Sequence, residues 1–179
     1  MKKTIELTIA GVKCDLELCS VSEKLDIAAF ILFDNVDVTV AAAKQLLEKV
    51  PDFDVILTPE AKSIPLAYEM ARTSGKPYVV IRKGTKVYMK NPICVDVRSI
   101  TTDRVQKLYL GEGDVERLKG KRILVVDDVI STGETLLAIE QLINRIGGKV
   151  AANCAVLAEG DAAERDDIVF LEKLPLFFK

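Results

Sequence analysis

The feature that most constrains the fold is an alternation of short apolar runs with helical patterns, which begins near Asp54. The apolar runs are too short for helices and rich in β-branched residues, and they lie at 55–58, 78–81, 122–126 and 150–157. Helical patterns separate them at 64–74, before Gly75, and at about 135–146, before Gly147 and Gly148. Strands that alternate with helices are joined by right-handed crossovers. The pattern therefore predicts an α/β fold with an open, mainly parallel sheet flanked by helices.

The first fifty residues have a different pattern. Alternating runs at 4–9 and 13–18 predict a hairpin that turns at Gly11. A helix is predicted for 38–50, with Asp37 as its N-cap, because apolar residues recur there at helical spacing. These residues are expected to form a small hood subdomain.

A second irregular stretch runs from 82 to 121, where no helical periodicity is found. Short strands are predicted at 86–89, 93–97 and 106–110, around a polar tip at 99–104. A long polar excursion in a compact domain is often a lid, here placed at about 96–108. The prediction is one domain over 1–179, with a core at about 51–159 and a hood from about 1–50 and 160–179 that includes a strand at 168–174.

Composition excludes several classes of protein. A net charge of −2 and a pI of about 5.4 argue against a protein that coats nucleic acid. The apolar stretch 27–33 is far shorter than the roughly 20 residues that span a bilayer, and Lys2 and Lys3 precede no signal-type apolar core. We therefore expect a cytoplasmic protein with no membrane partner.

Residue types narrow the chemistry further. The four cysteines are scattered and form no CxxC pair, which favours reduced thiols. The chain contains no histidine, so the commonest general base and the usual catalytic zinc sites are excluded. Catalysis would have to use carboxylates, cations, hydroxyls and backbone amides.

The most informative segment follows the apolar run 122–126. Asp127 and Asp128 come at the end of this predicted strand, where α/β sheets bind ligands, and strand alternation places their side chains on different sides. Residues 129–135 then supply hydroxyls, a glycine and successive amides just before a helix, an arrangement that binds a phosphate. Carboxylates beside a phosphate cradle indicate a sugar phosphate.

Residues 125–135 resemble the signature with which type I phosphoribosyltransferases bind phosphoribosyl pyrophosphate. Residues 58–63 resemble the pyrophosphate loop of the purine members, with Lys62 in the cation position, and 82–86 resemble their basic stretch. The resemblance implies catalytic roles for Asp127 and Asp128. It also implies donor-binding roles for Val129, Ile130, Ser131, Thr132, Gly133, Glu134, Thr135, Ala61, Lys62, Ser63, Lys83 and Lys86.

Two positions near these motifs stay open. Arg82 and Lys83 are neighbours on a strand, so only one is expected to reach the site, and Lys83 is favoured. Glu60 is interpreted either as a residue that stiffens its loop or as a ligand contact.

The resemblance implies transfer of a 5-phosphoribosyl group to a purine, with release of pyrophosphate. It also implies a homodimer, and Mg²⁺ held through substrate and water without direct protein ligands. Ser131 occupies a position where hypoxanthine-guanine enzymes carry an acidic residue and adenine and xanthine enzymes a small one. The lid sequence at 104–109 differs from that of adenine enzymes, so adenine and xanthine or guanine remain candidate bases.

Other functions and structures fit parts of this pattern. A non-catalytic regulator that binds phosphoribosyl pyrophosphate is the main alternative, and transfer to orotate or another pyrimidine is a third. A receiver domain is excluded, because only 51 residues follow Asp128. The segment before the second helix could also be an ordinary capped helix start at Thr132 or Thr135.

Overall fold

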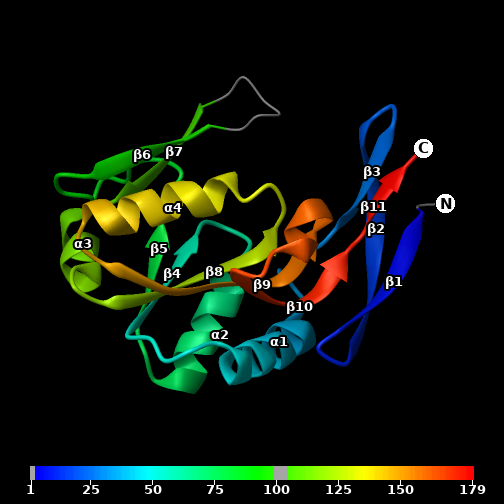
Figure 1. Cartoon of the computed structure of the whole chain (residues 1–179), viewed down its shortest axis with the longest axis horizontal. Coiled ribbons are helices and arrows are strands. Elements are labelled where there is room, and N and C mark those ends of the chain that lie inside the picture. The colour runs from blue at the N-terminus through cyan, green and yellow to red at the C-terminus, as the bar shows by residue number, and fades with distance from the viewer. Residues whose placement is uncertain (1–2, 99–104) are drawn as a thin grey trace.

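The centre of the molecule is a five-stranded sheet in which every neighbouring pair is parallel. This is a computed structural model that describes residues 3–98 and 105–179. The strand order is β10-β9-β8-β4-β5 (Figure 1). The strands are β4 (Val55–Pro59), β5 (Tyr78–Ile81), β8 (Arg122–Ile130), β9 (Lys149–Glu159) and β10 (Ile168–Leu174).

The chain leaves β4 and β8 in opposite directions along this sheet. From β4 it passes through α2 (Ile64–Ser74) to β5, and from β8 through α4 (Glu134–Arg145) to β9. Because both crossovers are right-handed, opposite directions place the two helices on opposite faces of the sheet. Figure 1 shows α2 beside α1 (Val36–Lys49) on one face and α4 on the other. The predicted α/β architecture is confirmed.

Strand β8 connects the two hydrophobic layers. Leu124 and Val126 face the layer of α1 and α2, whereas Ile123 and Val125 face the layer of α4. All four side chains are at most 2% exposed. Complete burial of one such aliphatic side chain contributes about 1.5–3 kcal/mol, which explains why a central strand is a continuous apolar run.

The hood is a four-stranded antiparallel sheet in the order β1-β2-β3-β11, which joins strands from both ends of the described chain (Figure 1). Its strands are β1 (Thr4–Ile9), β2 (Val12–Ser22), β3 (Leu25–Ala29) and β11 (Leu176–Phe178). Ala10 and Gly11 form the β1–β2 turn with φ values of 52° and 83°. A two-residue turn with both φ values positive matches the twist of a hairpin, so this hairpin was predicted correctly.

The prediction that residues 168–174 belong to the hood was wrong. These residues form β10, which pairs in parallel with β9 at the edge of the main sheet. Pro175 separates β10 from β11 and has no N–H to continue the ladder, so the chain changes sheets there. The hood boundaries also included α1, but this helix packs mainly against α2, β10 and β9 and less against β2 of the hood. The predicted hood was therefore too large.

The stretch 82–121 differs from the prediction at two places. Residues 86–89 form a turn and not a strand, and α3 (Glu112–Leu118) occupies a segment where no helix was predicted. A helix of seven residues is too short to show clear periodicity. The other two strands are present as the antiparallel pair β6 (Ile93–Arg98) and β7 (Val105–Leu110), while the predicted lid tip at 99–104 lies outside the described residues.

The boundaries of one helix and one strand also differ from the prediction. Helix α1 begins at Val36 after Asn35, so Asp37 lies in its first turn and is not the N-cap. Strand β8 continues to Ile130, so both aspartates lie inside the strand and not at its end, where they were predicted. In the described part of the chain, none of the helices is both long and apolar enough to cross a bilayer.

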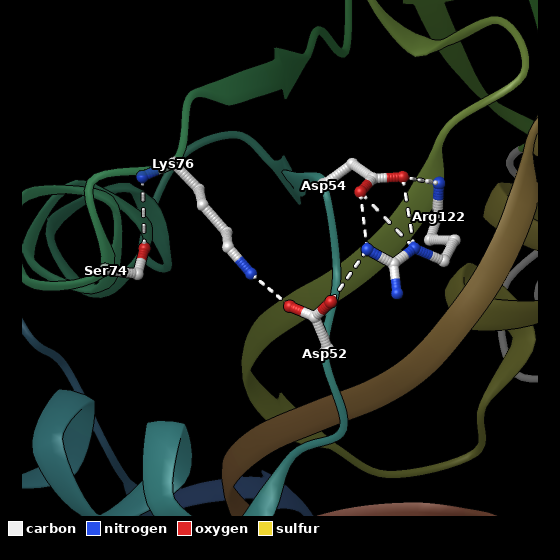
Figure 2. A network of polar contacts seen from close by, with 5 residues as sticks. All are labelled: Asp52, Asp54, Ser74, Lys76 and Arg122. Atoms are coloured by element: carbon white, nitrogen blue, oxygen red, sulfur yellow. Dashed lines mark hydrogen bonds and ion pairs between the residues drawn. The ribbon is translucent and has the colours of Figure 1, made fainter.

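A network of ion pairs closes the amino-terminal edge of the main sheet (Figure 2). The guanidinium group of Arg122 donates to Asp54 at 2.7 Å and lies 2.8 Å from Asp52. The Lys76 ammonium group lies 2.5 Å from Asp52 and 4.2 Å from the centre of the Phe53 ring. Hydrogen bonds from the Arg122 side chain and backbone lower the pKa of Asp54 to about 2. The network links the starts of β4 and β8.

We expect Asp54→Asn to change acid stability. The pKa of Asp54 is lower in the folded than in the unfolded chain, so its stabilisation is present above about pH 4 and is lost as the pH falls toward about 2. The variant should melt slightly below wild type at pH 7, and its melting temperature should fall less on acidification. Thermal unfolding across this range tests this, with Asp161→Asn as an exposed control. Equal acid sensitivity of wild type and Asp54→Asn would contradict it.

Candidate active site

The candidate site lies where the carboxyl ends of β4 and β8 meet. The hydroxyl group of Thr58 lies 2.8 Å from the carbonyl oxygen of Val126 and 2.8 Å from the Ser63 hydroxyl. Ser63 in turn donates to the carbonyl oxygen of Pro59 at 2.9 Å. These buried contacts fix the loop after β4 against β8 immediately before Asp127. The hydroxyl of Ser63, a predicted donor contact, points into this network, whereas Ala61 and Lys62 are exposed.

The two aspartates of β8 face different sides, as strand alternation requires. Asp128 points toward the loop after β4, where its Oδ2 atom lies 2.9 Å from the Nζ atom of Lys62. The Asp128 side chain is 7% exposed and that of Lys62 is 51% exposed. Asp127 lines a pocket on the α4 side and accepts a hydrogen bond from the backbone N–H of Asp128 at 2.8 Å. A cation and two carboxylates thus meet at one edge of the sheet.

The carboxyl group of Asp127 has an unusual protonation equilibrium. Burial, together with the negative charge of Asp128, raises its pKa to about 8. The positive charge of Lys62 opposes this shift. Asp127 therefore binds a proton over much of the neutral range in the free protein.

The pocket beside Asp127 is formed by the segment that leads into α4. Its volume is about 60 Å³, several times what one water molecule occupies. Gly133 adopts a left-handed conformation with φ 78° and precedes α4, and no side-chain capping hydrogen bond forms at this described helix end. The first amides of α4 are therefore available to an anion. This geometry disfavours the interpretation of an ordinary capped helix start.

Most residues predicted to bind the donor phosphate line this pocket. They are Val129, Ile130, Ser131, Thr132, Gly133 and Thr135. Glu134 is the first residue of α4 and does not line the pocket. Its acidic side chain lies in the first turn of the helix, where a carboxylate is favourable.

Glu60 connects the two basic stretches. Its Oε1 atom accepts the backbone N–H of Lys83 at 2.6 Å, and its Oε2 atom accepts from the Arg82 guanidinium at 3.0 Å. The Nζ atom of Lys86 lies 3.8 Å from Oε1. Although burial raises the pKa of Glu60, these hydrogen bonds hold it below its usual value. Glu60 is thus a loop-linking residue, and Arg82 is engaged by it while Lys83 remains exposed.

A divalent ion would receive few ligands from the protein itself. In residues 3–98 and 105–179, no three His, Cys, Asp or Glu side chains are grouped so that they could hold a metal ion. The carboxyl groups of Asp127 and Asp128 could accept hydrogen bonds from the waters of an Mg²⁺ ion whose own ligands would be water and the oxygens of the bound molecule. The residues present therefore fit an ion that arrives with a ligand.

The structural roles of Thr58 and Cys154 were not predicted from the sequence. Thr58 and Val126 are 68 positions apart, so no local motif reveals their contact. The only signal was a hydroxyl residue in an otherwise apolar buried strand, because a buried hydroxyl requires a partner. Cys154 was interpreted as a core residue, and it also lines the pocket.

Comparison with known proteins identifies the family. The profile of the phosphoribosyl transferase domain matches residues 36–175, so the chain belongs to this family. The predicted family and its purine branch are confirmed, because the curated relatives include an adenine phosphoribosyltransferase of Thermotoga petrophila and a hypoxanthine/guanine phosphoribosyltransferase of Ferroglobus placidus. They are 38% and 39% identical over 56% and 64% of this chain. The chain spans 56% and 57% of their lengths.

Two further matches describe the range of the family. The purine biosynthesis transcriptional repressor PurR of Bacillus subtilis is 28% identical over 63% of this chain and 39% of its own length. The crystal structure of an adenine phosphoribosyltransferase from Thermoanaerobacter pseudethanolicus superposes with a TM-score of 0.68 at 19% identity, over 96% of this chain and 95% of that chain. The structural match supports the fold.

We expect Asp127→Asn to change how stability depends on pH. The folded chain binds a proton at Asp127 between about pH 4 and about pH 8 that the unfolded chain releases, so wild-type stability should fall as the pH rises through this window. The variant mimics the protonated acid and should show a flatter profile. Melting temperatures from pH 5 to pH 9 test this, with Asp161→Asn as control. Parallel profiles for Asp127→Asn and wild type would contradict it.

Proposed function

We propose that this chain transfers the 5-phosphoribosyl group from phosphoribosyl pyrophosphate to a ring nitrogen of a purine, releasing pyrophosphate and forming a nucleoside monophosphate. The observation that carries the proposal is the contact between Lys62 and Asp128 at 2.9 Å. It brings a cation suited to pyrophosphate beside a carboxylate suited to ribose, next to the open end of α4. One ligand with all three groups would match this site.

The donor would be held by three sets of residues. The 5-phosphate would bind the amides and hydroxyls of residues 131–135 at the start of α4. Asp127 and Asp128 would accept hydrogen bonds from the ribose hydroxyls. The pyrophosphate would lie against Lys62, Lys83 and Lys86, with the exposed backbone at Ala61 beside it.

Catalysis would depend on charged side chains that stabilise the transition state and the leaving group. Carbon C1 of the ribose becomes cation-like as pyrophosphate leaves, so carboxylates near the ribose stabilise the transition state while cations stabilise the leaving group. Mg²⁺, when bound with the donor, would neutralise part of the pyrophosphate charge through ligand and water oxygens.

Two kinds of purine are proposed as the acceptor base: adenine on the one hand, and xanthine or guanine on the other. The small residue Ser131 favours adenine and xanthine enzymes, while the relatives include both adenine and hypoxanthine/guanine enzymes. The base is expected under the hood, next to the carboxyl ends of β8 and β9. A location in the cytoplasm is proposed with this role in purine salvage.

A homodimer is proposed from an exposed apolar groove. It has a volume of about 540 Å³ and lies between the start of α1 and the start of α2. Its exposed side chains include Phe33 at 50%, Val36 at 69%, Val40 at 46% and Tyr68 at 55%. Clustered apolar exposure of this kind is typical of a protein interface. A second copy covering it would also lie beside the loop that carries Lys62.

A regulator that binds the same donor without turnover is the second candidate, favoured by the match to PurR. The cations near the proposed pyrophosphate position argue for the enzyme, because a sensor needs to bind the donor but not to stabilise a leaving group. Transfer to orotate or another pyrimidine stands as a third candidate.

Nucleotide formation tests the proposed activity. With donor and Mg²⁺, we expect one or more of adenine, guanine, hypoxanthine and xanthine to give a nucleoside monophosphate and pyrophosphate, and orotate to give none. Asp128→Asn keeps the size of the side chain but removes its charge, so kcat should fall by about 100-fold or more. Donor binding without turnover by wild type would favour the regulator, and turnover of orotate alone would favour the pyrimidine enzyme.

The phosphate cradle is tested by calorimetry with phosphoribosyl pyrophosphate. Thr132→Ala and Thr135→Ala should each weaken donor binding by about 10-fold, because each removes a hydrogen bond to a charged group. Thr73→Ala removes a hydroxyl from α2, away from the proposed cradle, and serves as the matched control. Wild-type affinity in both cradle variants would show that the phosphate binds elsewhere.

A further inference from the structure

A cation lies against Gly133, in the segment proposed to bind the phosphate. A Cβ atom added to Gly133 would collide with the Nη1 atom of Arg165 and lie 3.6 Å from its Cζ atom. Arg165 does not line the pocket that Gly133 lines. The guanidinium group therefore fills the space that a side chain at position 133 would need, from outside the cradle.

The guanidinium group is held in this orientation by a second residue. Its Nε atom donates to Asp167 Oδ1 at 2.8 Å, and its Nη2 atom donates to Asp167 Oδ2 at 2.6 Å. This two-point fork raises the pKa of Arg165 and directs the remaining Nη1 edge toward Gly133. The Arg165 side chain is only 28% exposed.

The backbone of Arg165 is anchored as well. Arg165 follows the short 3₁₀ helix η1 (Gly160–Glu164), and its N–H donates to the carbonyl oxygen of Ala162 at 3.2 Å. Ala162 is 1% exposed and packs in the same hydrophobic layer as α4. The fork is thus tied to the helix whose first turn it supports.

We propose that Arg165, fixed by Asp167, is a positioning residue that holds Gly133 in its left-handed conformation and so keeps the amides of residues 131–135 directed at a phosphate. The inference rests on the proposed function of that cradle. Arg165 and Asp167 carry opposite charges, so the pair contributes little net field at the pocket. Its effect is on geometry, and small displacements of binding groups cost considerable affinity.

Calorimetry with phosphoribosyl pyrophosphate separates geometry from charge. Arg165→Gln and Asp167→Asn should each weaken donor binding by about fivefold, since either change breaks the fork. Electrostatics alone would predict tighter anion binding for Asp167→Asn, because that change removes a negative charge. In steady-state kinetics, KM for the donor should rise in both variants while KM for the purine stays near wild type.

The matched control is Arg72→Gln. Arg72 forms the same kind of fork with Glu69, at 2.9 and 2.7 Å, on α2. It should leave donor affinity near that of wild type. The proposal is overturned if Asp167→Asn binds the donor as tightly as wild type or more tightly, or if Arg165→Gln matches Arg72→Gln. If wild type itself binds no donor, the proposed function fails instead.

A ligand-free measurement tests the contact independently. Gly133→Ala should lower the melting temperature through strain at positive φ and through collision with Arg165. In the Arg165→Gln background the collision is relieved, so the same substitution should cost about 2–4 °C less. Equal losses in the two backgrounds would show that Arg165 does not brace Gly133.

Discussion

The contact between β4 and β8 at the level of Thr58 and Val126 is the constraint on which the candidate site depends. The chain departs from these adjacent strands in opposite directions, so the loops that follow them come together without any helix between them. The 2.8 Å contact from the Thr58 hydroxyl to the Val126 carbonyl fixes the position of one strand end relative to the other. One loop carries Lys62, and Asp128 lies in β8 shortly before the other loop begins, which makes their ion pair a consequence of sheet topology.

The same topology separates the two aspartates in function. Asp128 faces the side of α2 and meets a cation, whereas Asp127 faces the side of α4 and lines a pocket. Adjacent residues of one strand therefore have different electrostatic surroundings. A ligand that spans the end of β8 would contact one carboxylate that is ionically paired and one carboxyl group that carries a proton in the free protein.

Local sequence patterns were sufficient for much of this structure. The β-branched runs identified the central strands, Gly75 ended α2 as predicted, and the segment 125–135 located the pocket, because each depends on neighbouring residues. The pairing of strands and the contacts between distant residues were less predictable from the sequence. The run 168–174 is apolar enough for either sheet, and only its register with β9 decides between them. The helix α3 is too short to show a helical pattern of apolar residues. The contacts of Glu60 with Arg82 and of Arg165 with Gly133 join residues that are distant in sequence, so no local motif predicts them.

The ion pair of Lys62 and Asp128 also affects which molecules the site would reject. A simple anion such as inorganic phosphate could attract Lys62 away, but it would leave Asp128, only 7% exposed, without a compensating charge. A ligand that offers hydroxyl donors and an anionic group together can satisfy both partners when the pair opens. The protein's own salt bridge thus acts as a filter, since an incomplete ligand must bear the cost of an unpaired buried carboxylate.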